Sequence, residues 1–331
     1  MRACRPLGLL AAIIIALVGC RHARQPAQLP LPQAGELEEE GGWPRAFVDD
    51  LGAEVRLLGP ARRVVSLAPG FTETIFAIGA GDLLVGRTDF CDEPPAALEV
   101  PSVGGIVNPS LEMIVSLEPD LVLVIRGTPI DVIESLRRAG LPVIARDTHT
   151  LAEALAMVRD IGAYLGRQGP ADALADGLQT RMDAVVAAAR SRFARRPPPS
   201  VLLVTSLDPV FAAGPSSLVG DMIAAVGAVN AAAAPDARGA GLWPQLSLEA
   251  VVERDPDIIV LATEGHEGEP TRSAAPIAKL SGWRELSAVR RGQVWRIDPD
   301  LVSRSGPRVL DGLEQLASIV ETWARESDAD G

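Results

Sequence analysis

Few residues of this 331-residue chain could carry out covalent chemistry. Its three histidines, His22, His149 and His266, stand far apart in segments that we interpret as tether or loop. Cys91 could be a nucleophile, but no candidate base lies near it in the sequence, so we expect a packed thiol. The motifs of zinc proteases, redox dithiols, serine hydrolases and P-loop proteins are absent. The sequence therefore predicts a binding protein without catalytic residues, metal or cofactor.

The amino-terminus has the features of a secretory signal. Two arginines precede an uncharged, mostly apolar run over residues 7–18, which is too short to span a bilayer as a mature helix. The run ends in LVGC, which resembles the lipobox of bacterial lipoproteins, in which the cysteine is lipidated. We therefore expect a signal peptide over residues 1–19, lipid on Cys20, and export to the cell envelope or periplasm with attachment to a membrane. The alternative is an ordinary cleaved signal.

Composition limits the partners and the stabilising bonds. The formal net charge is −12, which argues against nucleic acid as a partner. Once Cys4 leaves with the signal and Cys20 carries lipid, only Cys91 remains, so no intramolecular disulfide can form. Residues 20–42 are rich in proline, glutamine, glycine and glutamate, a composition typical of a flexible tether.

The rest of the chain predicts an α/β fold with two similar lobes joined by a single long helix. Short, continuously apolar segments alternate with helical patterns, and such strands belong to parallel sheets covered by helices on both faces. A stretch that is helical nearly throughout interrupts this alternation; it opens with a capping box, Thr150-x-x-Glu153, and Gly169-Pro170 is expected to kink or divide it. The predicted segments are an amino-terminal lobe at 43–150, a connecting helix at 151–196 and a carboxy-terminal lobe at 197–331.

A repeated motif supports the two-lobe interpretation. SLEMIVSLEPDLVLV starts at Ser110, and SLEAVVERDPDIIVL starts at Ser247. Each reads as a serine-capped helix that a Pro-Asp pair separates from a buried strand. Any helix feeding a parallel strand could look alike, but Val64 and Val201, which open the first strand of each half, have the same spacing as the two serines. Two similar lobes imply a cleft between them, which is a favoured place for a small-molecule site.

Four segments resemble a known family, the substrate-binding proteins of ABC importers for cobalamin, iron siderophores and haem. These segments are SLAPGFTET, DFCDEPP, GLWPQLSLEAVVERDPDIIVL and DLVSRSGPRVLDGLEQLA. The resemblance spans residues 62–325 and is greatest to the cobalamin-binding members. It implies a monomer with two α/β lobes that captures cobalamin or a related corrinoid as cargo, rather than as a cofactor, and delivers it to an ABC permease with its ATPase subunits.

The resemblance also implies roles for single residues. Trp243 matches an aromatic that stacks on the corrinoid, and Phe211 is expected in the same wall. Asp300 and Arg304 match polar residues that reach the ligand's amide side chains. Glu93 stands where the cobalamin binders carry an aromatic residue at the pocket.

The first half of the chain departs from the cobalamin binders in two more places. Ile125 or Arg126 takes the place of a further pocket aromatic, and Gly104-Gly105-Ile106 takes the place of a tryptophan. The first lobe is thus expected to offer fewer aromatics to the ligand than the second.

The resemblance implies a docking role for two carboxylates. Glu73 and Asp221, one in each lobe, match the carboxylates that such proteins offer to arginines of the permease. Each also suits ordinary capping of the first turns of a helix.

Three alternative functions stay open. Haem would need an axial ligand, and the sole tyrosine, Tyr164, is predicted in the connecting helix. A ferric siderophore would need basic groups in the cleft, which Arg87, Arg126 and Arg304 could supply. A chelatase-like metal enzyme on a similar fold would need a cluster of metal ligands, which the sequence does not show.

Overall fold

The computed structural model describes residues 42–233, 241–263 and 267–329. The predicted signal peptide, nearly all of the tether, the lipidation site Cys20 and the residues His22 and His266 lie outside these ranges. None of the helices within them combines the length and the apolar character that a bilayer crossing requires.

The first lobe is a parallel sheet flanked by helices and preceded by a β-hairpin. Its four-stranded sheet has the order β4-β3-β5-β6. Strand β5 is buried along nearly its whole length, as its LVLVI sequence predicts. The elements are β1 (Arg45–Val48) and β2 (Glu54–Leu57) in the hairpin, then β3 (Val64–Ser66), α1 (Pro69–Ala77), β4 (Leu84–Arg87), α2 (Leu111–Ser116), β5 (Leu121–Ile125), α3 (Ile130–Arg138) and β6 (Val143–Arg146).

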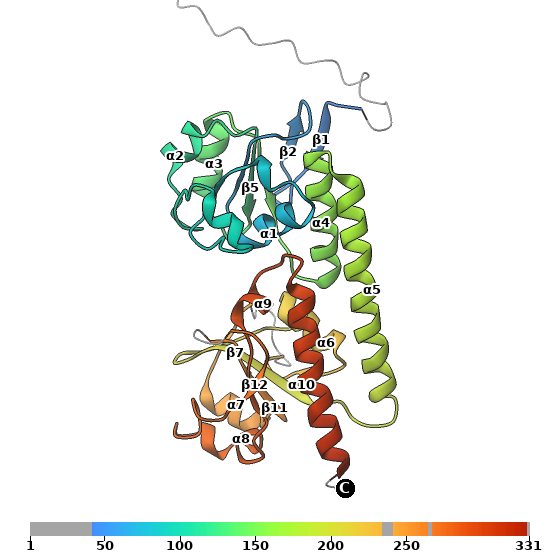
Figure 1. The fold of residues 1–331 in the computed structure, drawn as a ribbon. Helices are drawn as coiled ribbons and strands as arrows, with labels where there is room; N and C mark the ends of the chain where they lie inside the picture. Colours follow the sequence, from blue (N-terminus) through green and yellow to red (C-terminus); the bar gives the residue numbers. More distant parts are fainter. Residues whose placement is uncertain (1–41, 234–240, 264–266, 330–331) are drawn as a thin grey trace, which may run out of the picture. The chain divides into compact units, whose positions relative to one another are not determined.

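Two helices follow where one helical stretch was predicted. Helix α4 (Leu151–Leu165) opens with the predicted capping box, in which the side chains of Thr150 and Glu153 each accept a backbone N–H. It ends at Gly166 in the left-handed conformation, shortly before Gly169-Pro170, which lie in the first turn of α5 (Gln168–Arg192). Helix α5 packs against α4 at one end and against the carboxy-terminal helix at the other, so it joins the two lobes (Figure 1).

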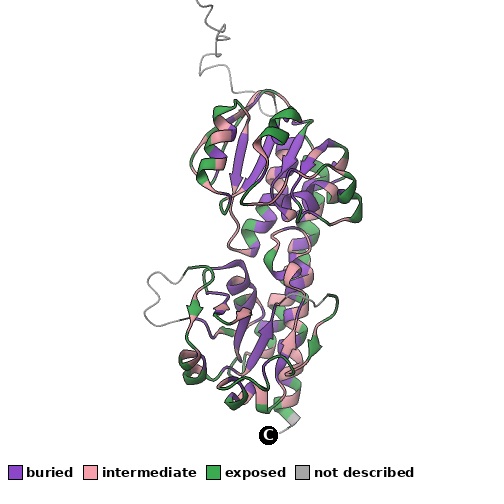
Figure 2. Ribbon diagram, turned by 90° about the vertical axis from the view of Figure 1, so that its left-hand side faces the viewer, coloured by how far each residue is buried: buried purple, intermediate pink, exposed green. Residues whose placement is uncertain are grey.

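The second lobe repeats this plan with additions. Its sheet has the order β10-β8-β7-β11-β13-β12, with β9 beside β7. In both lobes the strands are mostly buried and helices pack around them, as Figure 2 shows. The elements are β7 (Ser200–Leu207), β8 (Val210–Ala212), α6 (Leu218–Ala225), β9 (Val229–Asn230), β10 (Gln245–Leu246), α7 (Leu248–Arg254), β11 (Ile258–Leu261), β12 (Thr271–Arg272), α8 (Ser287–Arg290), β13 (Val294–Arg296), α9 (Pro299–Ser303) and α10 (Val309–Ala329).

The repeated motif performs the same structural task in each lobe. Ser110 caps α2 and Ser247 caps α7, each through its hydroxyl. The aspartate of each Pro-Asp pair accepts a backbone N–H next to the first strand of its lobe: Asp120 from Arg63 at 2.9 Å, and Asp257 from Ser200 at 2.8 Å. The bond aligns the strand after the helix with its parallel neighbour, so the echo in the sequence is a repeated strand-pairing device.

The exposed face of α5 offers a simple test of the connecting helix. A Cβ added at Gly177 would meet no atom within 4 Å, so Gly177→Ala should stabilise the protein by about 0.5–1 kcal/mol through helix propensity. Urea unfolding followed by circular dichroism measures the change. Gly162→Ala is the contrasting control, because its Cβ would lie 2.2 Å from that of Ala171 and should destabilise the α4–α5 contact. A lower unfolding midpoint for Gly177→Ala would contradict the helix assignment at this position.

Candidate functional site in the cleft between the lobes

Two adjoining cavities lie between the lobes. One, of about 310 Å³, is lined by Ile125, Gly127 and residues 146–149 of the first lobe and by Trp243 and other residues of the second. The other, of about 290 Å³, lies between the start of α1 and the end of α9. The cavities share Ile125, Ser303 and Ser305, so they form one candidate site in the predicted cleft.

Trp243 lies at the rim of the first cavity, where it remains 37% exposed. Its loop is held against the end of β8: Ala212 donates to the carbonyl of Pro244 at 3.1 Å, and Gly214 donates to that of Leu242 at 2.9 Å. A Cβ at Gly214 would lie 2.8 Å from the carbonyl oxygen of Gly241, so glycine is what permits this close packing. An indole presented in this way offers a flat apolar face to a ligand in the cleft.

The first lobe contributes a mixed apolar wall to the second cavity. Its larger members are Phe90, Ile106 and Ile125. Phe90 is 54% exposed, which is unusual for a phenylalanine and is explained by its position on the cavity. The expected shortage of aromatics in this lobe therefore has one exception, which the sequence interpretation missed although the DFCDEPP motif contains it.

Arg304 lies in the same cavity and makes ion pairs with both lobes. Asp92 of the first lobe contacts it at 2.5 Å, and Asp300 of its own helix at 2.6 Å. Glu73 of α1 is a third carboxylate, at 3.6 Å. Burial lowers the pKa of Arg304, but the carboxylates outweigh burial and raise it. The guanidinium therefore keeps its positive charge, and the surrounding carboxylates already balance that charge within the protein.

Glu73 occupies a different environment from the one predicted. The sequence interpretation assumed a surface carboxylate ready for a permease, whereas the side chain is only 5% exposed and pairs with Arg308 at 3.1 Å. Burial raises its pKa, and Arg308 and Arg304 offset this rise in part. In this arrangement Glu73 is an inter-lobe contact, and it can reach a partner only if the lobes separate locally.

The second predicted docking residue, Asp221, is half-buried on α6. Its carboxylate accepts the backbone N–H of Leu151 at 2.8 Å, which ties the start of α4 to the second lobe. Both predicted docking carboxylates therefore also contact another part of the chain.

The remaining predicted ligand residues lie around the cleft rather than together inside it. Arg126 is exposed and pairs with Asp147 at 3.7 Å. Glu93 lines a separate hollow with Glu73 and Arg308. Phe211 lies on β8 in register with Gln245 and lines neither of the two cavities described above.

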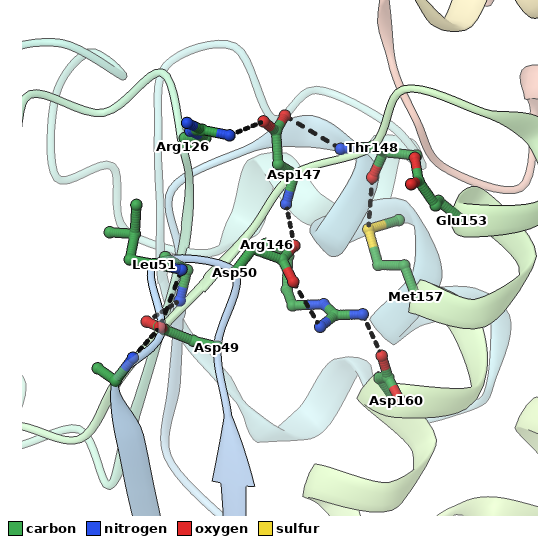
Figure 3. A network of polar contacts seen from close by, with 12 residues as sticks. Asp49, Asp50, Leu51, Arg126, Arg146, Asp147, Thr148, Glu153, Met157 and Asp160 are labelled. Carbon is green, nitrogen blue, oxygen red and sulfur yellow. Dashed lines mark hydrogen bonds and ion pairs between the residues drawn. The ribbon is translucent and has the colours of Figure 1, made fainter.

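A polar network supports the segment of the first cavity that follows β6 (Figure 3). Asp50, in the hairpin turn, accepts the backbone N–H of Asp147 at 2.6 Å and pairs with Arg146 at 3.0 Å; Arg146 also pairs with Asp160 of α4. Asp147 in turn holds the Nε2 of His149 at 2.7 Å. His149, which was predicted as a solvated loop residue, lines the first cavity.

The burial of Glu73 gives a testable pH dependence. A carboxyl with a raised pKa in the folded state contributes stability below its unfolded pKa of about 4.5, and this contribution is lost as pH rises through the raised value. Glu73→Gln should remove this contribution, so the mutant should lose less stability than the wild type between about pH 4.5 and neutrality. Urea unfolding across this range measures the difference, and identical slopes would contradict the raised pKa. Asp92→Asn is a control with the opposite sign. Burial raises the pKa of Asp92, but Arg304 outweighs burial and lowers it below its usual value, so this carboxylate contributes stability that is lost as pH falls.

Comparisons with known proteins agree with this architecture. Residues 64–301 match the family described as periplasmic binding protein. The chain belongs to this family. A substrate-binding lipoprotein of an ABC transporter from Bacillus subtilis, YvrC, whose function is uncharacterised, is 31% identical over 318 residues, which cover 95% of this chain and 96% of the relative.

Two solved structures of the family are similar in fold. The vitamin B12-binding protein BtuF of Vibrio cholerae has a TM-score of 0.67 at 29% identity, covering 80% of this chain and 98% of that one. The haem-binding protein RhuT of Roseiflexus sp. RS-1, in its apo form, has a TM-score of 0.66 at 30% identity, covering 80% and 99%. This periplasmic binding protein is therefore a substrate-binding protein of ABC importers and not an enzyme, and the molecule that it binds is cargo rather than a cofactor.

Proposed function

We propose that this protein captures cobalamin or a related corrinoid in the inter-lobe cleft and delivers it to an ABC permease. The observation that carries the proposal is that the cleft combines apolar walls with arginines that already pair with carboxylates of the protein itself. Trp243, Phe90 and Ile125 offer faces to a large, flat and mostly apolar ligand. The serines and Arg304 between them offer hydrogen bonds suited to neutral amide groups.

The charge of the cleft disfavours an anionic iron chelate. Arg304 is shared by three carboxylates, and Arg146 by two. Arg87 is buried and donates to the carbonyls of Thr88 and Ala97, so its guanidinium is engaged in the lobe. A ligand with several negative charges would have to displace these internal partners, which costs the desolvation of each carboxylate it replaces.

Haem is the second candidate, favoured by one observation. His149 lines the cleft, and its Nε2 pairs with Asp147, which would orient the ring for coordination through the other nitrogen. The sole tyrosine, Tyr164, is buried in α4 with its ring edge-on to Phe47, away from the cavity-lining residues.

Calorimetric titration of the full chain with cyanocobalamin, haem and a ferric hydroxamate siderophore tests the choice between ligands. We expect saturable 1:1 binding of cyanocobalamin with a dissociation constant of about 1 μM or lower, equivalent to a binding free energy of about −8 kcal/mol or more negative. The dissociation constants of the other two ligands should be at least tenfold higher. Tight haem binding without cyanocobalamin binding would replace the corrinoid proposal with the haem one.

Anchoring and docking complete the proposal. The lipobox of Cys20 and the lipoprotein name of the Bacillus relative support attachment to a membrane near the permease. Asp221 on α6 is the more accessible of the two predicted docking carboxylates, and Glu73 would join it only after the lobe contact opens.

The docking role predicts a loss of transport without a loss of capture. Asp221→Lys should reduce cyanocobalamin uptake by cells at least tenfold, since a repelled rim charge disturbs association with the permease, while the affinity of the purified protein stays within about twofold. Asp82→Lys makes the same change of charge at an exposed site of the first lobe and should leave uptake unchanged. Normal uptake with Asp221→Lys would remove this residue from the docking surface.

A further inference from the structure

A direct ion pair between the lobes lies at the ligand cavity. Arg304, whose side chain is 10% exposed, lines the cavity from the second lobe. Asp92 of the first lobe meets it with both carboxylate oxygens, one at 2.5 Å from Nη1 and the other at 3.4 Å from Nη2. A two-pronged contact of this kind fixes the orientation of a guanidinium as well as its position.

The backbones of the two lobes touch next to this pair. A Cβ added at Gly70, in the first turn of α1, would lie 2.8 Å from the backbone nitrogen of Gly306. A Cβ added at Gly306 would lie 3.1 Å from the Cα of Gly70 and 2.7 Å from Oε2 of Glu73. Two facing glycines thus permit a contact that any larger residue would force apart.

The two carboxylates that reach across the cleft differ in their energetics. Burial raises the pKa of Glu73 more than its arginine partners lower it, so its charge is tolerated at the contact rather than favoured. For Asp92 burial also raises the pKa, but Arg304 outweighs burial and the pKa falls below its usual value. Since a lowered pKa means that the folded protein favours the carboxylate, Asp92 provides the net stabilising half of the contact.

We propose that Asp92 is a positioning residue that clamps Arg304 across the cleft, holding the lobes in contact and orienting the guanidinium toward the cavity before the ligand arrives. The clamp places the arginine only while the lobes are together, so closure of the cleft and formation of the ligand site are one event. The role of Arg304 toward the ligand rests on the proposed function, whereas the clamp itself does not.

Accessibility of Glu73 measures the state of the clamp without any ligand. Its carboxylate is covered while Gly70 and Gly306 touch, so a water-soluble carbodiimide with glycine ethyl ester should modify it only when the lobes separate. In the full chain, Asp92→Asn should increase modification of Glu73 several-fold, as followed by peptide mass spectrometry. Asp82→Asn, which removes a charge from an exposed site of the same lobe, should not.

The salt dependence of Glu73 modification distinguishes an electrostatic clamp from a purely structural role of Asp92. The clamp is a partly exposed ion pair, so raising the sodium chloride concentration from about 50 to 500 mM should increase Glu73 modification in the wild type by screening. The same change should have little further effect on Asp92→Asn, whose clamp is already absent. A parallel increase in both proteins would overturn the proposal.

Gly306→Ala tests the lobe contact with Asp92 intact. Its methyl group should act as a wedge against Gly70 and Glu73 and increase Glu73 modification, with the far-UV circular dichroism unchanged. Protection of Glu73 equal to that of the wild type in Asp92→Asn would overturn the clamp, and equal protection in Gly306→Ala would overturn the close lobe contact at Gly70.

Titration with cyanocobalamin then separates the clamp from the proposed function. Asp92→Asn should bind at least tenfold more weakly than the wild type and Asp82→Asn equally well. Unaltered affinity in Asp92→Asn would show that Asp92 does not position Arg304 for the ligand. If the wild type itself does not bind cyanocobalamin, the corrinoid proposal fails, while the Glu73 measurements still decide whether the clamp exists.

Discussion

Replacing Trp243 with alanine is expected to weaken cyanocobalamin binding at least tenfold, equivalent to about 1.4 kcal/mol or more. The indole is the largest apolar side chain that the described residues of the second lobe contribute to the first cavity, and its loop is fixed by backbone bonds to β8. A rigid aromatic ring buries area against a flat ligand at little cost in conformational entropy, so truncation removes this contact without a compensating gain. Titration of the purified variants measures the loss.

Tryptophan fluorescence gives a second, independent measurement of the same contact. Cyanocobalamin should quench the emission of the wild type strongly, and Trp243→Ala should remove most of the quenching. Trp323→Phe is the matched control, because Trp323 lies on α10 under Arg196, with its ring centroid 5.1 Å from that guanidinium, and should keep both affinity and quenching. Unchanged affinity in Trp243→Ala would remove this residue from the site.

The scaffold could be predicted from the sequence because its signals are local. A strand buried on both faces must be apolar throughout, and a serine cap or a capping box sets the start of a helix within one turn. The capping box at Thr150 and the helix starts after Ser110 and Ser247 are confirmed. The repeated Pro-Asp pairs were interpreted as helix ends, and the structure adds that their carboxylates bond the neighbouring strand.

The contacts across the cleft could not be predicted in the same way. Glu73 and Arg308 are 235 positions apart, and nothing near either residue indicates the other. Glu73 follows the start of a helix, where an acid is ordinary, so its burial could not be expected from its local sequence. Only the arrangement of the lobes shows that α1 meets the segment before α10, and that contact turns a presumed surface charge into an inter-lobe partner.

Some site residues lie in motifs that the sequence analysis had already singled out. Asp92 and Phe90 belong to the DFCDEPP segment, and Arg308 belongs to the same SGPR letters that follow Arg304. The motifs located the right loops, but choosing among their residues requires knowing which side chains face the opposite lobe. Glu93, selected for its departure from the family pattern, lines a neighbouring hollow instead.

The lipid anchor predicts an all-or-none difference between two cysteine variants. A thioether-linked diacyl group can form only on a cysteine, and two acyl chains together hold a protein on a membrane far more stably than one. Cys20→Ser should therefore lose all incorporation of an alkyne-tagged palmitate during growth and should no longer partition into the detergent phase of Triton X-114 after removal of its signal. Cys91→Ser is the matched control, since this thiol is fully buried beside Thr88 at 3.2 Å, and it should be labelled like the wild type. Label that persists in Cys20→Ser would place the lipid elsewhere or refute the lipobox. Loss of label confined to Cys20→Ser would mean that the residue after the signal carries the lipid that anchors this binding protein.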